Sequence, residues 1–322
     1  MKKQTKIDFS LLNSDEPVRL GSEPGVAEQI HIFDDDSRMA VKSALAAGRP
    51  LLVRGEPGVG KTQLAAAAAK ALRRPLVSCV VNARTESTDL LWHFDSVRRL
   101  AEAQVCGVLK LTEEEIEHKL RVTRFVEPGP LWWGFDWDGA KAHVQENHCS
   151  IPLFDDSTDP NNGRVVLIDE IDKADSDLPN GLLEALGSGC FTPHGCRRVV
   201  MHDPAPLVII TTNEDRVLPD AFLRRCLVLH MSLPVTDDAL RELLVKRGRS
   251  HFPEISENLL QDAANLLIED RRMATTPKPG QAEFFDLLRA VQMLVEQQVD
   301  TAENLLKKVA GYTLKKHAGG VR

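Results

Sequence analysis

Residues 50–62 read Pro-Leu-Leu-Val-Arg-Gly-Glu-Pro-Gly-Val-Gly-Lys-Thr, and this stretch decides the expected fold. The apolar run 51–53 predicts a buried strand, and the alanine-rich segment 63–72 predicts a helix. Between them, residues 55–62 match G-x-x-x-x-G-K-[ST], a turn that curls backbone N–H groups around a phosphate. The succession of strand, turn and helix predicts a phosphate-binding loop in an α/β protein.

The residue types in this loop suit a bound nucleotide. Gly58 and Gly60 permit positive φ and leave space for the phosphate. Lys61 supplies a cation for the β- and γ-phosphates, and the hydroxyl of Thr62 is a ligand that suits Mg²⁺. The expected cofactors are therefore ATP and Mg²⁺. The predicted nucleotide-binding residues of the loop are Gly55, Glu56, Pro57, Gly58, Val59, Gly60, Lys61, Thr62 and Gln63.

A second apolar run, 165–168, ends in two carboxylates, Asp169 and Glu170. The end of a parallel strand delivers such groups to the edge of the sheet where ligands bind. Asp169 is the expected second Mg²⁺ ligand, and Glu170 is expected to polarise the attacking water. An N-capping Asp followed by a solvated Glu is the alternative. The phosphate loop earlier in the chain favours the catalytic interpretation.

The remaining pattern predicts two kinds of structure along the chain. Five β-rich apolar runs predict a parallel sheet flanked by helices: 50–54, 76–81, 165–168, 207–212 and 226–231. After residue 233 the pattern is helical throughout. We therefore expect an N-terminal extension at 1–25, an α/β nucleotide-binding core at 26–233 with an insertion at about 100–160, and a helical lid domain at 234–322.

Composition narrows the choice of partners and compartment. Of the 322 residues 43% are apolar and 27% charged, which is typical of a globular protein. The net charge of -7 argues against nucleic acid or an anionic membrane as the main partner. No apolar run is long enough to cross a bilayer or resembles a secretory signal. Six scattered cysteines predict a reduced, cytoplasmic protein.

Three motifs taken together resemble those of the AAA+ ATPases. Residues 55–62 resemble Walker A, residues 169–174 resemble Walker B, and Thr211-Thr212-Asn213 resembles sensor 1. The resemblance covers nearly everything from about residue 26 onward. Within AAA+, the runs 125–131 and 182–186 are similar to segments of the MoxR group. The family implies a P-loop (ASCE/AAA+) fold with a five-stranded parallel sheet and a small C-terminal helical lid.

The same resemblance assigns further site residues. Asn213 would orient the attacking water, and Arg225, assisted by Arg224, would be the arginine finger that acts on the ATP of a neighbouring subunit. Two solvated surface arginines are the alternative. MoxR proteins usually carry a sensor 2 arginine where this chain reads Thr276 to Ala282. Lys278 is the candidate replacement, and a solvated loop lysine fits the position equally well.

By resemblance, the function is that of an ATP-hydrolysing ring, expected to be hexameric, that remodels or matures a partner protein. MoxR proteins work with partners that contain a von Willebrand factor A domain. A slow ATP-dependent switch or scaffold is the second hypothesis, and a DNA-acting AAA+ motor is the third.

Two other segments invite a functional interpretation. Cys190, His194 and Cys196 lie close in sequence, as zinc ligands do, but a β-hairpin explains the run 190–201 more simply. Trp132, Trp133 and Trp137 are concentrated in one short segment. A local core that pins the insertion is the favoured interpretation, and a partner-binding patch is the alternative.

Overall fold

A computed structural model describes residues 7–14, 16–21, 29–109, 111–147, 149, 151–152, 157–175, 177–274 and 278–315. Its contacts divide the chain into two compact units. Unit 1 consists of Met1–Ser14, Asp34–Val53 and Ala65–Leu229, and unit 2 consists of Asp15–Phe33, Arg54–Leu64 and His230–Arg322. Each unit consists of three segments that alternate along the sequence with those of the other unit. The domains expected from the sequence are instead continuous. Those boundaries stay predictions.

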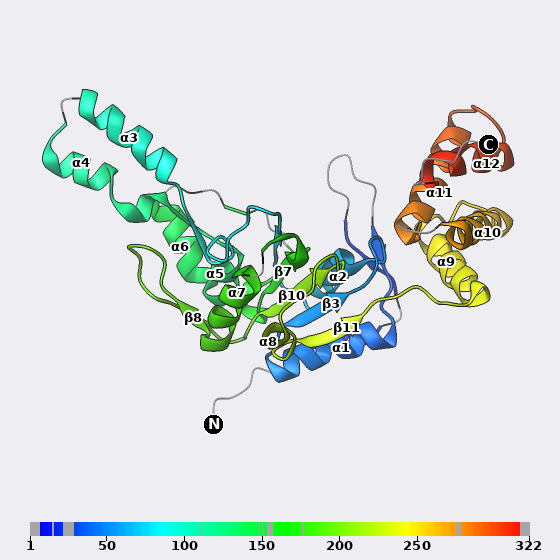
Figure 1. Ribbon diagram of the computed structural model, residues 1–322, viewed down its shortest axis with the longest axis horizontal. Coiled ribbons are helices and arrows are strands. Elements are labelled where there is room, and N and C mark those ends of the chain that lie inside the picture. The colour runs from blue at the N-terminus through cyan, green and yellow to red at the C-terminus, as the bar shows by residue number, and fades with distance from the viewer. Residues whose placement is uncertain are drawn as a thin grey trace. The chain divides into compact units, whose positions relative to one another are not determined.

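A five-stranded parallel sheet carries the α/β fold, in the order β11-β3-β10-β7-β4 (Figure 1). Its strands are β3 (Leu51–Arg54), β4 (Leu76–Val80), β7 (Val165–Asp169), β10 (Leu207–Thr212) and β11 (Leu227–His230). β7 pairs in parallel with both β10 and β4, with Val165 aligned to Leu207 and to Leu76. β10 is buried along its whole length, which explains its unbroken apolar run 207–210. All five predicted strands are confirmed.

Helices lie alongside this sheet and begin and end at residues suited to those positions. They are α1 (Asp35–Ala47), α2 (Lys61–Ala71), α7 (Asp177–Ser188) and α8 (Asp220–Leu223). Asp34 caps α1, because its carboxylate accepts the backbone N–H of Ser37 at 2.8 Å. Gly48 ends the same helix in the left-handed conformation, with φ of 59°. Short 3₁₀ turns occur at Leu11–Asn13 and Pro160–Asn162.

The insertion between β4 and β7 packs its aromatic residues into the core of the sheet. It contains β5 (Trp92–Phe94), α3 (Ser96–Val108), α4 (Glu113–Lys119), a 3₁₀ turn (Val122–Phe125), β6 (Val126–Pro128), α5 (Pro130–Phe135) and α6 (Trp137–Asn147). α5 packs against β4 and β7. Trp132 and Trp133 are only 4% and 2% exposed, so these two residues form core. Their burial confirms that these two residues are core rather than a surface patch, but the core is continuous with that of the sheet and is not local to the insertion.

Two smaller predictions in unit 1 are also confirmed. Thr112 and Glu115 form a capping box at the start of α4: the Thr hydroxyl accepts the Glu115 N–H, and the Glu carboxylate accepts the Thr112 N–H. The segment 190–201 is a hairpin of β8 (Cys190–Phe191) and β9 (Val199–Val200). Within the described part of the chain, no group of three or more His, Cys, Asp or Glu is arranged to hold a metal ion.

Unit 2 is mainly a helical bundle of α9 (Asp237–His251), α10 (Glu257–Met273), α11 (Gln281–Glu296) and α12 (Ala302–Thr313). These helices pack on a shared apolar core that includes Leu244, Leu267, Phe284 and Leu287. The predicted helical character after residue 233 is confirmed for the residues described. The unit also contains a short antiparallel pair, β1 (Val18–Arg19) and β2 (Ile30–His31). Among the described helices, none has both the length and the apolar character needed to cross a bilayer.

Candidate functional site

The phosphate loop connects β3 to α2 and has the backbone that the sequence pattern requires. Gly55, Gly58 and Gly60 have φ of 153°, 77° and 102°. A Cβ on Gly55 would lie 2.1 Å from the carbonyl oxygen of Met231, so no larger residue fits there. Lys61 is 7% exposed, and its ammonium donates to the carbonyls of Gly55 at 2.7 Å and Glu56 at 2.9 Å. The loop therefore holds a buried cation against its own backbone.

The acidic pair at the end of β7 is held by the neighbouring strand β10. The hydroxyl of Thr211 donates to the Asp169 carboxylate and accepts the backbone N–H of Glu170 at 2.9 Å. Glu170 itself adopts the left-handed conformation, with φ of 60° and ψ of 47°. Such a backbone is uncommon for a residue with a side chain, and functional sites are where it concentrates. Thr211 thus orients both carboxylate residues.

Asn213 and Glu170, two of the predicted site residues, are in contact. The side-chain amide of Asn213 donates to Glu170 Oε1 at 3.1 Å. Asp172, in the 3₁₀ turn Ile171–Lys173, is buried and accepts the backbone N–H groups of Asn213 at 3.4 Å and Asp215 at 2.9 Å. This role of Asp172 was not predicted from the sequence. The only trace of it in the sequence was a carboxylate two residues after the acidic pair Asp169–Glu170.

Strand order places the ends of β3, β10 and β7 at one edge of the sheet. The phosphate loop follows β3, Asn213 follows β10, and Asp169 ends β7; β10 lies between the other two strands. In a parallel sheet the carboxyl ends of neighbouring strands share one edge. Thr62 and Asp169 each offer an oxygen donor that suits Mg²⁺, which takes one or two protein ligands and keeps several waters. Each of these two oxygen donors, taken by itself, has the chemistry that Mg²⁺ prefers.

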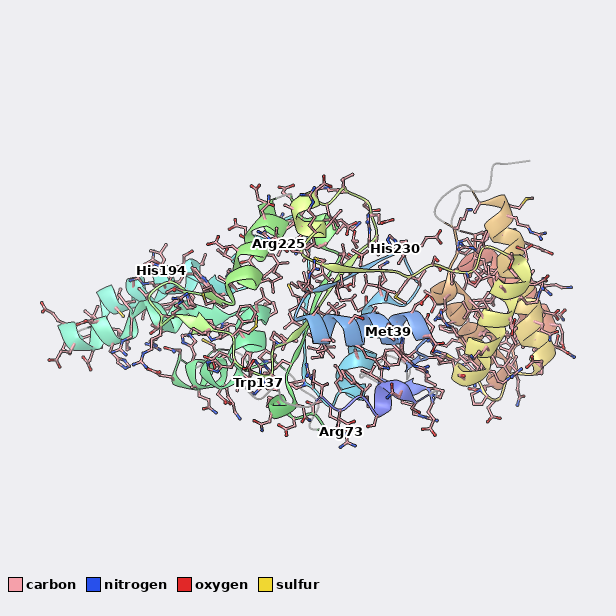
Figure 2. The ribbon with its side chains drawn as sticks, turned by 90° about the horizontal axis from the view of Figure 1, so that it is seen from below. Met39, Arg73, Trp137, His194, Arg225 and His230 are labelled. Atoms are coloured by element: carbon pink, nitrogen blue, oxygen red, sulfur yellow. The ribbon has the colours of Figure 1, made fainter. Side chains whose placement is uncertain are left out.

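Arg224 and Arg225 follow α8, and a third arginine anchors their backbone. The guanidinium of Arg49 donates to the carbonyls of Arg225 at 3.1 Å, Cys226 at 3.2 Å and Arg224. Cys226 is buried, whereas the residues Arg224 and Arg225 are exposed, and Figure 2 labels Arg225. The segment has a fixed backbone with two exposed cationic side chains. Arg49 was not identified from the sequence, because it lies 175 residues before Arg224.

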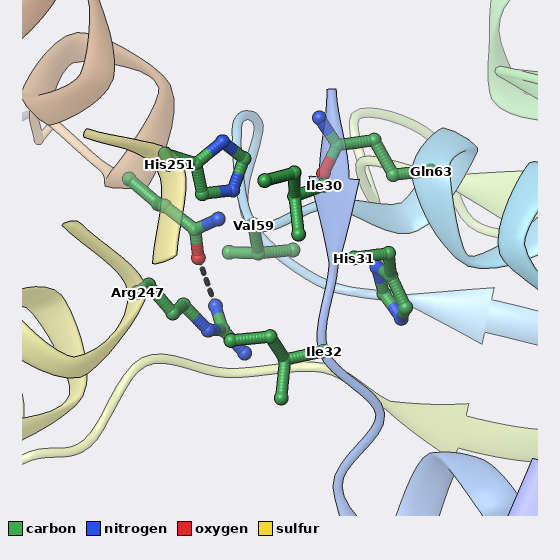
Figure 3. A pocket seen from close by; sticks show the side chains of 8 residues that line it. Ile30, His31, Ile32, Val59, Gln63, Arg247 and His251 are labelled. Carbon is green, nitrogen blue, oxygen red and sulfur yellow. Dashed lines mark hydrogen bonds between the residues drawn. The ribbon is translucent and has the colours of Figure 1, made fainter. Parts of the chain in front are cut away.

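Unit 2 contains a pocket beside the phosphate loop that the sequence did not predict (Figure 3). The side chain of Arg247 on α9 donates to that of Gln281 on α11. In the close-up, Ile30 lies between His251 and Gln63, and Val59 is drawn below it. The only signal in the sequence was the apolar segment 30–33 ahead of α1. The pocket is lined by Ile30, His31, Ile32, Val59, Gln63, Arg247, His251 and Gln281.

The environment of His251 keeps its imidazole neutral. Burial, with a smaller effect of the charges of Arg289 and Arg247, lowers the pKa of His251 to about 4, although a hydrogen bond with the Ile30 backbone opposes the shift. The ring packs on Phe285, with 4.1 Å between centroids. The pocket is thus lined by a neutral imidazole and by the cationic side chain of Arg247.

The predicted sensor 2 candidate lies at the end of the helical bundle. Lys278 is exposed, in the segment before α11, and residues 275–277 next to it lie outside the described residues. Arg289 pairs with Asp286 on its own helix at 3.0 Å. The bundle does place another arginine at the phosphate loop: Arg271, near the end of α10, lies 3.1 Å from the Glu56 carboxylate.

Comparisons with known proteins bear on the family. The family model for the AAA domain of the dynein-related subfamily matches residues 50–226, which is more than half of the chain. No functionally curated protein matches the sequence. Among solved structures, the chain is similar to one mutant of RuvB from Thermotoga maritima (16% identity, TM-score 0.47, 86% of this chain and 68% of that one). A second mutant of the same RuvB gives 16% identity, a TM-score of 0.45 and coverage of 86% and 66%.

The matched segment contains the phosphate loop, the acidic pair and Asn213. It ends at Cys226, directly after the two exposed arginines. The chain therefore belongs to the AAA domain family, in its dynein-related subfamily, and is an ATP hydrolase.

Proposed function

We propose that this ATPase is of the MoxR type and works as a ring, expected to be hexameric, in which Arg225 of one subunit acts on the ATP bound by its neighbour. One observation carries the ring proposal: the anchoring of an exposed arginine pair through its backbone. Arg49 donates to the backbone carbonyls of residues 224–226 and so holds this main chain in place. The exposed guanidinium groups of Arg224 and Arg225 therefore project from an anchored backbone. An arginine finger supplied by a neighbour needs this combination of exposure and fixed position.

Within one subunit, each site residue has a role that its contacts support. Lys61 and the loop N–H groups bind the phosphates, while Thr62 and Asp169 would hold Mg²⁺, which neutralises phosphate charge when bound. Glu170 would accept a proton from the attacking water. Asn213 positions the Glu170 carboxylate by its 3.1 Å hydrogen bond. Arg224 would assist Arg225 at the subunit boundary.

ATP stays the proposed nucleotide, in line with the ATP hydrolase activity that the family shows. The pocket in unit 2 has room for little more than a water-sized group and carries no part of this proposal. Lys278 stays a candidate for a cation directed at the phosphates, as the sequence suggested.

The work done by the ring is inferred from the resemblance to the MoxR group. We propose that hydrolysis remodels or matures a protein client that carries a von Willebrand factor A domain. The acidic net charge supports a protein client over nucleic acid. Addition of a purified protein of this class should raise the ATPase rate, and salt-dependent DNA binding with stimulation by DNA would instead favour a motor on nucleic acid.

The decisive experiment measures ATP hydrolysis and oligomeric mass together over a range of protein concentrations. We expect wild-type specific activity to rise as the ring assembles, and Glu170→Gln to bind ATP in the same assembly without turnover. Arg225→Ala and Glu170→Gln subunits should each be inactive alone and partly active when mixed, because each supplies what the other lacks. A wild-type monomer with concentration-independent turnover would contradict the ring, and a monomer with negligible turnover would favour the slow switch.

A further inference from the structure

Arg271 lies in the last turn of α10, and its side chain contacts both the segment before α11 and the phosphate loop. Its guanidinium donates to the carbonyl of Pro279 at 2.6 Å and to the carboxylate of Glu56 at 3.1 Å. The Arg271 side chain is only 15% exposed, whereas that of Glu56 is 54% exposed. One cation therefore joins the segment that leads into α11 to the second residue of the phosphate loop.

The start of α11 also touches the loop. A Cβ on Gly58 would lie 3.2 Å from the Cβ of Ala282, and a Cβ on Gly280 would lie 3.4 Å from the carbonyl oxygen of Pro57. Small residues at these points let the helix end and the loop approach each other closely. The helical bundle thus meets the loop through backbone-level packing and through the Arg271–Glu56 ion pair.

The ion pair matters because of the charge that the loop has to bind. Glu56 places a carboxylate one residue from Gly55, whose carbonyl accepts the Lys61 ammonium. A carboxylate beside a site for a polyanionic phosphate chain disfavours binding by like-charge repulsion. A guanidinium within 3.1 Å compensates that charge.

We propose that Arg271 is a positioning residue for ATP: it neutralises Glu56 and ties the phosphate loop to the helical bundle, so that the bundle responds to the charge of the bound nucleotide. This inference rests on the proposed use of the loop for ATP. It does not depend on the ring, on the arginine finger or on Lys278. ATP carries more negative charge than ADP, so the loss of Arg271 weakens ATP binding more than ADP binding.

The test is a double-mutant cycle read out by equilibrium binding of fluorescent ATP and ADP analogues, with no requirement for turnover. Arg271→Ala should weaken ATP binding about tenfold, within the range usual for coupled sites, and ADP binding less. Adding Glu56→Gln should restore most of that loss, because the carboxylate is then gone. Glu56→Gln alone should bind ATP more tightly than wild type, since Arg271 then remains as an uncompensated cation.

Arg272→Ala is the matched control, because Arg272 occupies the same turn, carries the same charge and pairs instead with Asp237 of α9. It should bind ATP as wild type does. Equal losses for Arg271→Ala and Arg272→Ala, or no rescue by Glu56→Gln, would overturn the proposal. If Arg271→Ala does not fold, weaker ATP binding by Glu56→Gln alone would overturn it. Wild-type protein that binds neither nucleotide would instead contradict the proposed function.

Discussion

The side-chain amide of Asn213 lies 3.1 Å from Oε1 of Glu170, so the residue that follows β10 holds the carboxylate that follows β7. The two residues are separated by 43 positions in sequence, and adjacent parallel strands bring them together. A general base acts only when its carboxylate is correctly placed, because proton transfer requires hydrogen-bond reach. Under the proposed mechanism, in which Glu170 is the general base, this contact makes Asn213 a positioning residue.

We expect Glu170→Gln to lower the hydrolysis rate by about 10²–10⁴-fold, the usual contribution of a general base, with little change in ATP affinity. Asn213→Ala should lower the rate about tenfold, and Asn213→Asp should lower it more, because a second carboxylate would repel that of Glu170. Steady-state phosphate release at saturating ATP measures both. Equal rates for Asn213→Ala and Asn213→Asp would show that the electrostatic environment of Glu170 does not matter.

Arg49→Gln should reduce hydrolysis about tenfold without weakening ATP binding, because it removes the donors that hold the carbonyls of Arg224, Arg225 and Cys226. Arg49→Lys should recover only part of the rate, since an ammonium lacks the planar fork of a guanidinium. The rate is measured in assembled protein, with Lys42→Gln as a surface-charge control. Unchanged hydrolysis by Arg49→Gln would show that the anchor has no catalytic effect.

Trp133→Ala should lower the free energy of unfolding by about 3–5 kcal/mol, the cost usual for deleting a large buried aromatic side chain. Trp133 is 2% exposed and packs in the core that α5 forms with the sheet. Val97→Ala, at a position in the same insertion that is 77% exposed, is the control and should change it by less than about 0.5 kcal/mol. Urea unfolding measures both, and equal midpoints would contradict the burial of Trp133.

Stability should depend on pH through His251, whose folded-state pKa is about 4 and whose unfolded value is near 6.5. Between these values the unfolded chain binds more protons than the folded one. The free energy of unfolding should therefore fall as pH is lowered from 6.5 to 4, and be unaffected by this group above that window. Urea unfolding across this range measures the slope, and His251→Phe should flatten it. An unchanged slope in that variant would assign it to other groups.

The sheet could be predicted from the sequence because two signals coincided at each strand. Runs such as 165–168 and 207–210 are apolar at successive positions, as strands buried on both faces require, and each ends at a residue with evident chemistry. The hairpin at 190–201 and the capping box at Thr112 were predictable for a similar reason. Their determinants lie within a few residues of one another.

The contacts of Arg49 and Arg271 could not be predicted, because their partners are far away in sequence. Arg271 and Glu56 are separated by 215 positions, and the pattern around each is that of an ordinary surface arginine or glutamate. Asp172 was overlooked for another reason: its acceptor role depends on the backbone N–H groups of 213–215, which no side-chain pattern reveals. Local pattern gave the residues of the phosphate loop but not the groups that support them.

The left-handed backbone at Glu170 lowers the stability of the folded protein at the residue whose side chain is proposed to act in catalysis. A residue with a Cβ held at φ of 60° costs about 1–2 kcal/mol relative to a relaxed conformation, and glycine would avoid that cost. Glycine at this position would also remove the carboxylate that we propose as the general base. Under the proposed mechanism, selection for thermal stability alone would favour glycine at residue 170 and abolish hydrolysis. Engineering of this protein for stability should therefore leave Glu170 unchanged.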